Sequence, residues 1–200
     1  MLGYAVIILL AFITTLVSMY SAWQNRKTDT LVSEAYYPMV LTLKETEMMA
    51  SETYKLTNNW IYQPSAEEKE KLKNIHAKEV ALQKEKLSTI ASKFDNEVAT
   101  EGQDIVAAFE ALVLDEQFVM EKLSNDTSYS NDVIVDEAIT GMDKRITPSY
   151  KKLTELITIG SDHLKQLLIE AKEQKEASSK MLSYLYISNI VLFLLIGVYA

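Results

Sequence analysis

The chain of 200 residues contains no cysteine, and it contains only five glycines and three prolines. The lack of cysteine excludes a disulfide framework, a thiolate nucleophile and a zinc site built on cysteine. Glycine and proline are too scarce for the many turns of an all-β protein. The composition therefore favours a helical fold.

Charge is missing from both ends of the chain. Every Lys, Arg, Asp and Glu lies between Arg26 and Lys180. Each uncharged end holds about 20 residues, enough for a helix to cross about 30 Å of hydrocarbon. We expect transmembrane helices over residues 2–23 and 181–200, on either side of one domain at residues 24–180.

The first apolar segment has two interpretations, a cleaved signal peptide or an uncleaved span. It has no basic residue before its apolar run, and Met19 and Tyr20 occupy positions where cleavage needs small residues. An uncleaved span is favoured. Tyr20 and Trp23 then lie where aromatic side chains meet a membrane interface.

The charges near the two spans do not by themselves support an external domain. Arg26, Lys27 and Lys180 all lie on the domain side, which the positive-inside rule would place in the cytoplasm. Long domains, however, cross the membrane largely regardless of charge. We expect residues 24–180 to lie outside the cytoplasm. The net charge of −8 argues against nucleic acid as a partner, because phosphate binding needs clustered Lys and Arg.

Apolar residues recur at three- and four-residue steps along most of the domain, which is typical of helices with one buried face. The expected helices cover residues 28–62, 66–98, 101–123 and 131–180, the last continuing into the second span. We expect a kink or restart near Pro38, a bend at Pro148, and capping boxes at Ser65–Glu68 and at Thr100. Residues 124–131 are expected to form a loop.

Four amphipathic segments with short connections predict an all-α fold, an antiparallel up-down-up-down four-helix bundle flanked by two transmembrane helices. The first helix has a seam that comprises Ala35, Met39, Leu43, Thr46, Ala50, Thr53, Leu56 and Trp60. The fourth seam comprises Ile146, Tyr150, Leu153, Ile157, Gly160, Leu164, Leu167, Ala171, Ser178 and Met181.

The sequence offers little chemistry. His76 and Glu79 are one helical turn apart, and His163 is the other histidine. Such residues can hold a metal, but a helical His-x-x-Glu pair is common by chance, so we interpret both histidines as solvated or as part of a seam. There is no Gly-rich phosphate loop and no recognisable nucleophile pattern. We expect no enzyme activity and no cofactor, and we assign no catalytic or metal-binding residue.

Four aromatic residues fall near the turns farthest from the spans: Tyr54, Trp60, Tyr62 and Tyr129. They could line a ligand pocket. The simpler interpretation, which we favour, is that they close the end of the core. The ligand-binding residues remain unassigned at this point.

This layout resembles the four-helix-bundle sensor domain of bacterial methyl-accepting chemotaxis receptors and sensor histidine kinases. The matching features are the uncleaved first span, a proline followed by spaced leucines at residues 34–43, and the pattern of residues 136–141 and 146–156. The tip at residues 60–63 looks like versions found ahead of histidine kinases. Only Arg26 and Arg145 are available for the arginine-based amino-acid sites of the best-known receptors, and no ligand-binding residue is carried over.

The resemblance implies a signal-transduction receptor in the bacterial inner membrane. Residues 24–180 would detect a small molecule or an extracytoplasmic binding protein, as a homodimer, and the second span would relay the signal to an output domain encoded after Ala200. Pro148 and Gly160 are candidate points of compliance in the relay helix. The alternatives are a passive two-span tether or partner-binding scaffold and, less favoured, a metal-containing bundle enzyme.

Overall fold

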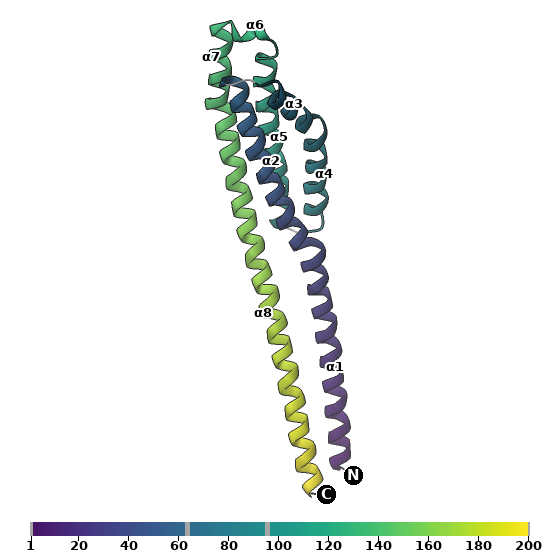
Figure 1. Cartoon of the computed structure of the whole chain (residues 1–200). Coiled ribbons are helices and arrows are strands. Elements are labelled where there is room, and N and C mark those ends of the chain that lie inside the picture. Colours follow the sequence, from purple (N-terminus) through teal and green to yellow (C-terminus); the bar gives the residue numbers. More distant parts are fainter. Residues whose placement is uncertain (1, 63–64, 95–96, 200) are drawn as a thin grey trace. The chain divides into compact units, whose positions relative to one another are not determined.

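The protein is all-helical in the computed structural model, which describes residues 2–62, 65–94 and 97–199 (Figure 1). No strand occurs within these ranges, so the predicted all-α class is confirmed. The elements are α1 (Leu2–Leu31), η1 (Val32–Tyr36), α2 (Tyr37–Tyr62), α3 (Ala66–Asn74), η2 (Ile75–Glu79), α4 (Val80–Ala91), α5 (Glu97–Lys122), α6 (Asp126–Tyr129), α7 (Asp132–Gly141), η3 (Met142–Ile146) and α8 (Thr147–Tyr199). The three η elements are π-helical turns.

The chain divides into two compact units. Unit 1 comprises residues 1–36 and 165–200, and unit 2 comprises residues 37–164. Helix α8 contributes to both, its first part to unit 2 and the remainder to unit 1. The division falls inside the predicted domain of residues 24–180, because the helices near residues 24–36 and 165–180 group with the apolar ends.

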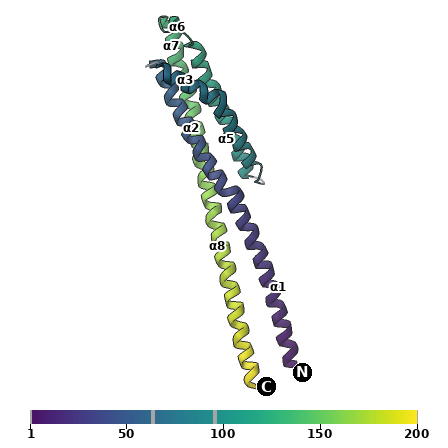
Figure 2. The same ribbon diagram turned by 45° about the vertical axis from the view of Figure 1, so that its right-hand side comes forward.

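Unit 2 buries the apolar faces of its helices against one another. Helix α2 lies against α3, α4, α5 and α7, and α5 also lies against α4, α7 and η3 (Figures 1 and 2). All eight residues of the first predicted seam are buried. In the fourth seam, Ile146, Leu153, Ile157 and Leu164 are buried, whereas Met181 is exposed. Periodicity therefore identified the core-facing sides of α2 and of the first part of α8.

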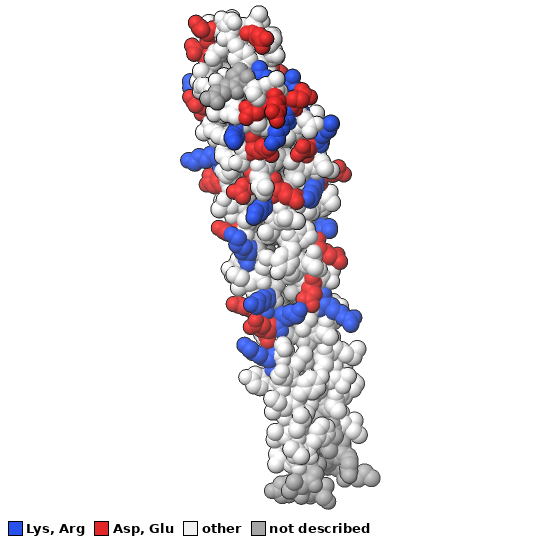
Figure 3. Space-filling view, in the orientation of Figure 1, with Lys and Arg blue, Asp and Glu red and all other residues white. Residues whose placement is uncertain are grey.

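Unit 1 keeps many apolar side chains on its surface. In α1 these include Ile8, Leu9, Phe12, Leu16 and Met19, and in α8 they include Tyr184, Ile187, Ile190, Phe193 and Leu194. Figure 3 shows that the blue and red charged side chains stop before the end of the molecule that holds the two chain ends. Within the described residues, one helical run, Asp132–Leu195, contains an apolar stretch long enough to cross a membrane, and none of that stretch is buried.

Hydroxyl and amide side chains join α1 to α8 inside unit 1. The Ser21 and Ser178 hydroxyls share a hydrogen bond, and the Asn189 side-chain amide donates to the Thr14 hydroxyl. Ser18 Oγ and Tyr186 Oη lie 3.1 Å apart. Such bonds hold apolar helices together where hydrophobic burial alone gives no preference between lipid and protein. The side chains of residues 1–4 and 7, at the start of the predicted first span, lie outside those described.

Proline explains two of the three π-helical turns. Pro38 lies two residues after η1 and Pro148 two residues after η3. Proline lacks an amide proton and crowds the carbonyl four residues earlier, and a turn with one extra residue relieves that crowding. The interruptions expected near Pro38 and Pro148 are therefore present as wide turns within nearly continuous helix.

Several predicted helix boundaries were wrong. The second helix ends at Ala91 instead of residue 98, because a turn at residues 92–94 reverses the chain. Helix α5 begins at Glu97, so Thr100 lies inside the helix and not at its start. Residues 124–131 include the short helix α6, capped by Asn125. The expected helix end at residues 63–64 lies outside the described residues.

The Ser65 cap is confirmed in its main part. The Ser65 hydroxyl accepts a hydrogen bond from the Glu68 amide at 3.1 Å. The Glu68 carboxylate does not complete the reciprocal bond and instead accepts from Asn59 Nδ2 at 2.9 Å. The cap therefore starts α3 and also ties it to α2.

Close packing of α4 on α5 requires glycine at position 102. A Cβ added to Gly102 would lie 2.6 Å from Ala91 Cβ, which cannot rotate away. We predict that Gly102→Ala lowers the unfolding free energy by about 1–3 kcal/mol through overpacking. Thermal unfolding followed by circular dichroism in detergent measures the change.

Gly160→Ala is the matched control. Its Cβ would meet only the flexible end of Ile105, at 3.3 Å, and the tip of Leu43, at 3.8 Å. Alanine also gains up to about 1 kcal/mol in helix propensity at both sites. Equal melting temperatures for the two variants would contradict the proposed close contact between α4 and α5.

Candidate functional site

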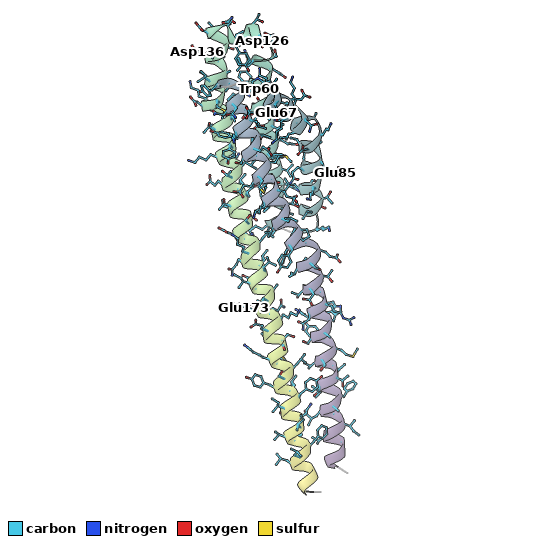
Figure 4. All side chains as sticks on the ribbon, in the orientation of Figure 1. Trp60, Glu67, Glu85, Asp126, Asp136 and Glu173 are labelled. Carbon is cyan, nitrogen blue, oxygen red and sulfur yellow. The ribbon has the colours of Figure 1, made fainter. Side chains whose placement is uncertain are left out.

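The end of unit 2 formed by α2, α3 and α6 is closed by two aromatic residues. Trp60 is 3% exposed, and its indole Nε1 donates to the Leu123 carbonyl at 3.0 Å. The Tyr129 hydroxyl donates to the Trp60 carbonyl at 2.7 Å. Figure 4 labels Trp60 on α2. These bonds fasten the end of α2 to α5 and α6.

Lysine side chains of α3 cover this aromatic pair. Lys69 Nζ lies 4.3 Å from the Tyr129 ring centre and 5.3 Å from that of Trp60, and Lys73 Nζ lies 5.8 Å from the latter. Burial, with a smaller effect from the charge of Asp126, raises the pKa of Tyr129 to about 12. The phenol is therefore a hydrogen-bond donor across the physiological pH range.

The four predicted aromatic residues do not converge on one pocket. Tyr54 stacks on Tyr150 of α8, with ring centres 4.5 Å apart, and its hydroxyl lies 3.2 Å from that of Thr147. Tyr62 is 55% exposed. Trp60 and Tyr129 close the core, as the simpler sequence interpretation holds, and Tyr54 joins α2 to α8.

A surface groove of about 950 Å³ lies between α2 and α3. Its charged lining residues are Lys44, Glu47, Glu52, Lys55, Glu67, Glu68 and Lys71, and Met48, Leu56 and Tyr150 supply apolar surface. An ion pair of 2.5 Å between Lys71 and Glu52 bridges the two helices. The mixture of both charge signs on an open surface suits a small polar molecule that carries both charges.

The core of unit 2 contains several buried polar side chains. Gln83 of α4 donates to the Thr42 carbonyl at 3.1 Å and to the Thr46 hydroxyl at 2.8 Å. Thr53 and Thr57 are also buried on α2. Within the described residues, four buried side-chain atoms have no hydrogen-bond partner: Thr42 Oγ1, Thr57 Oγ1, His76 Nδ1 and Glu116 Oε1. A buried polar atom without a partner costs about 1–3 kcal/mol.

His76 of η2 and Glu116 of α5 form a further buried polar contact in this core. His76 Nε2 lies 2.9 Å from Glu116 Oε2, and the side chains are 5% and 0% exposed. Burial raises the pKa of Glu116, whereas His76 and the Thr53 hydroxyl oppose that rise and the charge of Asp115 adds to it. A net charge on a pair this deeply buried would cost several kcal/mol.

The histidines do not build a metal site with Glu79. Glu79 is exposed, and His163 pairs instead with Glu101, at 3.0 Å, in a half-exposed position. No cluster of three or more His, Asp or Glu suited to a metal occurs among the described residues. His76 is a buried seam residue, one of the two interpretations the sequence left open. Its partner Glu116 was missed, because sequence spacing does not relate residues on different helices.

Comparison with family models, with curated proteins and with solved structures found no match.

The Tyr129 bond to Trp60 yields a stability prediction. Tyr129→Phe leaves the buried Trp60 carbonyl without this donor and should lower the unfolding free energy by about 1 kcal/mol. Thermal unfolding in detergent measures the loss. Tyr62→Phe, at an exposed position, is the control and should leave the melting temperature unchanged. Equal effects of the two variants would show that the hydroxyl bond does not fasten the tip.

Proposed function

We propose that this chain is the membrane-bound input part of a bacterial signal-transduction receptor, of the chemoreceptor or sensor-kinase type. In this proposal residues 24–180 form an extracytoplasmic sensor domain, and residues 2–23 and 181–200 are its two transmembrane helices. Unit 2 forms the membrane-distal part as an antiparallel four-helix bundle made of α2, α3 with α4, α5, and α7 with the first part of α8.

The course of α8 carries this proposal. The helix begins at Thr147 among the buried residues of unit 2 and continues without a break to Tyr199 in the apolar part of unit 1. In the middle of an α-helix every backbone N–H and C=O group is hydrogen-bonded within the helix. The helix therefore passes from water into lipid without exposing unpaired backbone groups. A shift of its first part is therefore transmitted along the same hydrogen-bonded backbone.

The hydroxyl and amide bonds between α1 and α8 support a paired arrangement of two spans. They lie at three successive levels, from Ser21–Ser178 through Ser18–Tyr186 to Thr14–Asn189. Polar residues within a membrane usually face another helix and are functional when present. A register shift of one span against the other would exchange these partners, which gives the pair discrete positions.

The groove between α2 and α3 is the proposed ligand-binding surface of the receptor. It is open to solvent, lies in unit 2 and borders the Lys71–Glu52 pair. A small zwitterion, or the surface of a binding protein, would compete for those two charges. A ligand changes the conformation only if it prefers one of two arrangements of α2 and α3. We propose a homodimer as the functional unit, as the resemblance implies.

Single-cysteine labelling tests the topology, because the chain has no natural cysteine. Ser51 is exposed on α2 and Ile190 is 58% exposed on α8. A membrane-impermeant maleimide added to intact bacterial spheroplasts should label Ser51→Cys and leave Ile190→Cys unlabelled. Ile190→Cys should stay unlabelled after lysis, because lipid covers it. Labelling of Ser51→Cys only after lysis would overturn the external domain.

Disulfide formation tests the pairing of the spans. The Ser21 and Ser178 hydroxyls are hydrogen-bonded, so Ser21→Cys with Ser178→Cys should crosslink rapidly in membranes under mild oxidation. The control pairs Tyr20→Cys with Ser178→Cys, because Tyr20 is 65% exposed and lies about 100° around α1. Gel mobility after oxidation measures both rates. Equal rates would contradict the hairpin of two spans.

A further inference from the structure

The π-helical turn η2 has no proline to account for it. Turns η1 and η3 each end two residues before a proline, whereas no proline occurs between Pro64 and Pro148. A single π-helical turn inside an α-helix often marks a functional position. Turn η2 differs from η1 and η3 in that it contains His76, whose side chain pairs with Glu116 of α5.

Three elements supply the groups that act on Glu116. Turn η2 supplies His76, α5 supplies Glu116 and its neighbour Asp115, and α2 supplies the Thr53 hydroxyl. Asp115 accepts hydrogen bonds from Arg145 Nε of η3, at 3.0 Å, and from the Ser149 hydroxyl of α8, at 2.7 Å. Asp115 is held by these two partners, and its charge still adds to the rise in the pKa of Glu116.

The number of protons on the pair decides its net charge. The pair has no net charge when one proton lies between His76 Nε2 and Glu116 Oε2 and a second proton is bound to His76 Nδ1. This holds whether the shared proton is bound to the carboxyl or to the imidazole. Loss of one proton leaves a net negative charge with Oε1 unpartnered, and a gained proton leaves a net positive charge. Burial of a net charge costs several kcal/mol, so each change weakens the packing around it.

The direction of the pH effect follows from Glu116. Burial is the largest cause that raises its pKa above the ordinary 4.5. A carboxyl with a raised pKa in the folded state contributes its full stability below pH 4.5, and that contribution is lost as the pH rises through the folded-state value. A rise in pH through that value therefore loosens the contact of η2 with α5, and a fall back through it restores the contact.

We propose that the His76–Glu116 pair is a proton-binding site through which the pH around unit 2 controls the closure of α3, η2 and α4 onto α5. The protonated pair holds these elements closed, and the deprotonated pair opens them. The proton is then a stimulus of the receptor, a role that rests on the proposed function. The binding site itself rests only on the buried pair, its two unpartnered atoms and the π-helical turn that contains His76.

Hydrogen exchange measured by mass spectrometry tests the proposal on the full chain in lipid nanodiscs. Amide protection of residues 66–91 is compared between pH 5.5 and pH 8, after correction for the intrinsic exchange rates. Protection in the wild-type chain should fall by up to about tenfold per pH unit, the limit for one linked proton. Glu116→Gln keeps the size of the side chain and should remove this dependence.

Glu101→Gln is the matched control, because it alters the other His–Glu pair. His163 and Glu101 lie 3.0 Å apart but are 27% and 24% exposed, so water solvates their charges. This variant should keep the wild-type pH response at residues 66–91. A flat wild-type profile, or the same slope in the wild-type chain and in Glu116→Gln, would overturn the proposal.

If Glu116→Gln does not fold, a second measurement tests whether Glu116 is part of a proton-binding site. The carbon-13 shift of the wild-type Glu116 carboxyl, assigned with the help of His76→Gln, should titrate with a midpoint well above 4.5. A midpoint at or below 4.5 would overturn the proton site. Labelling of Ser51→Cys only after lysis would instead remove the receptor role and leave a titrating pair intact, so the two failures are distinguishable.

Discussion

The constraint on which this structure depends is the unbroken backbone bonding of α8. A helix of 53 residues has side chains buried against protein in its first part and apolar side chains exposed in its last part. The change of surroundings happens within one element, so no loop has to be stabilised at the boundary. The polar bonds of α1 to α8 then fix which faces of the two helices meet inside unit 1.

The core of unit 2 contains buried polar groups that lower its stability. Its central helix α2 presents Thr42, Thr46, Thr53 and Thr57 to the interior, where purely apolar side chains would pack without unpartnered atoms. Buried polar groups are costly unless all of them are satisfied. The four atoms without a hydrogen-bond partner therefore lower the stability of this core.

The three π-helical turns illustrate two different causes of the same local geometry. At η1 and η3 the cause is covalent, since a proline two residues later forbids a regular hydrogen bond. At η2 no such cause exists, and the turn coincides with a buried pair formed with another helix. The first kind was expected from Pro38 and Pro148. The second kind was visible only after η2 and α5 were placed side by side.

The sequence by itself determined the helical class, the buried faces of α2 and the first part of α8, the Ser65 cap and the uncharged ends, because each depends on spacing or composition within a few turns. Helix boundaries near residues 92–101 failed, because the local propensity for helix continues where packing of α4 on α5 requires a turn. Only the tertiary structure joined His76 to Glu116, Tyr54 to Tyr150 and Ser21 to Ser178. Contacts between helices depend on register and rotation, which no repeat within one helix encodes.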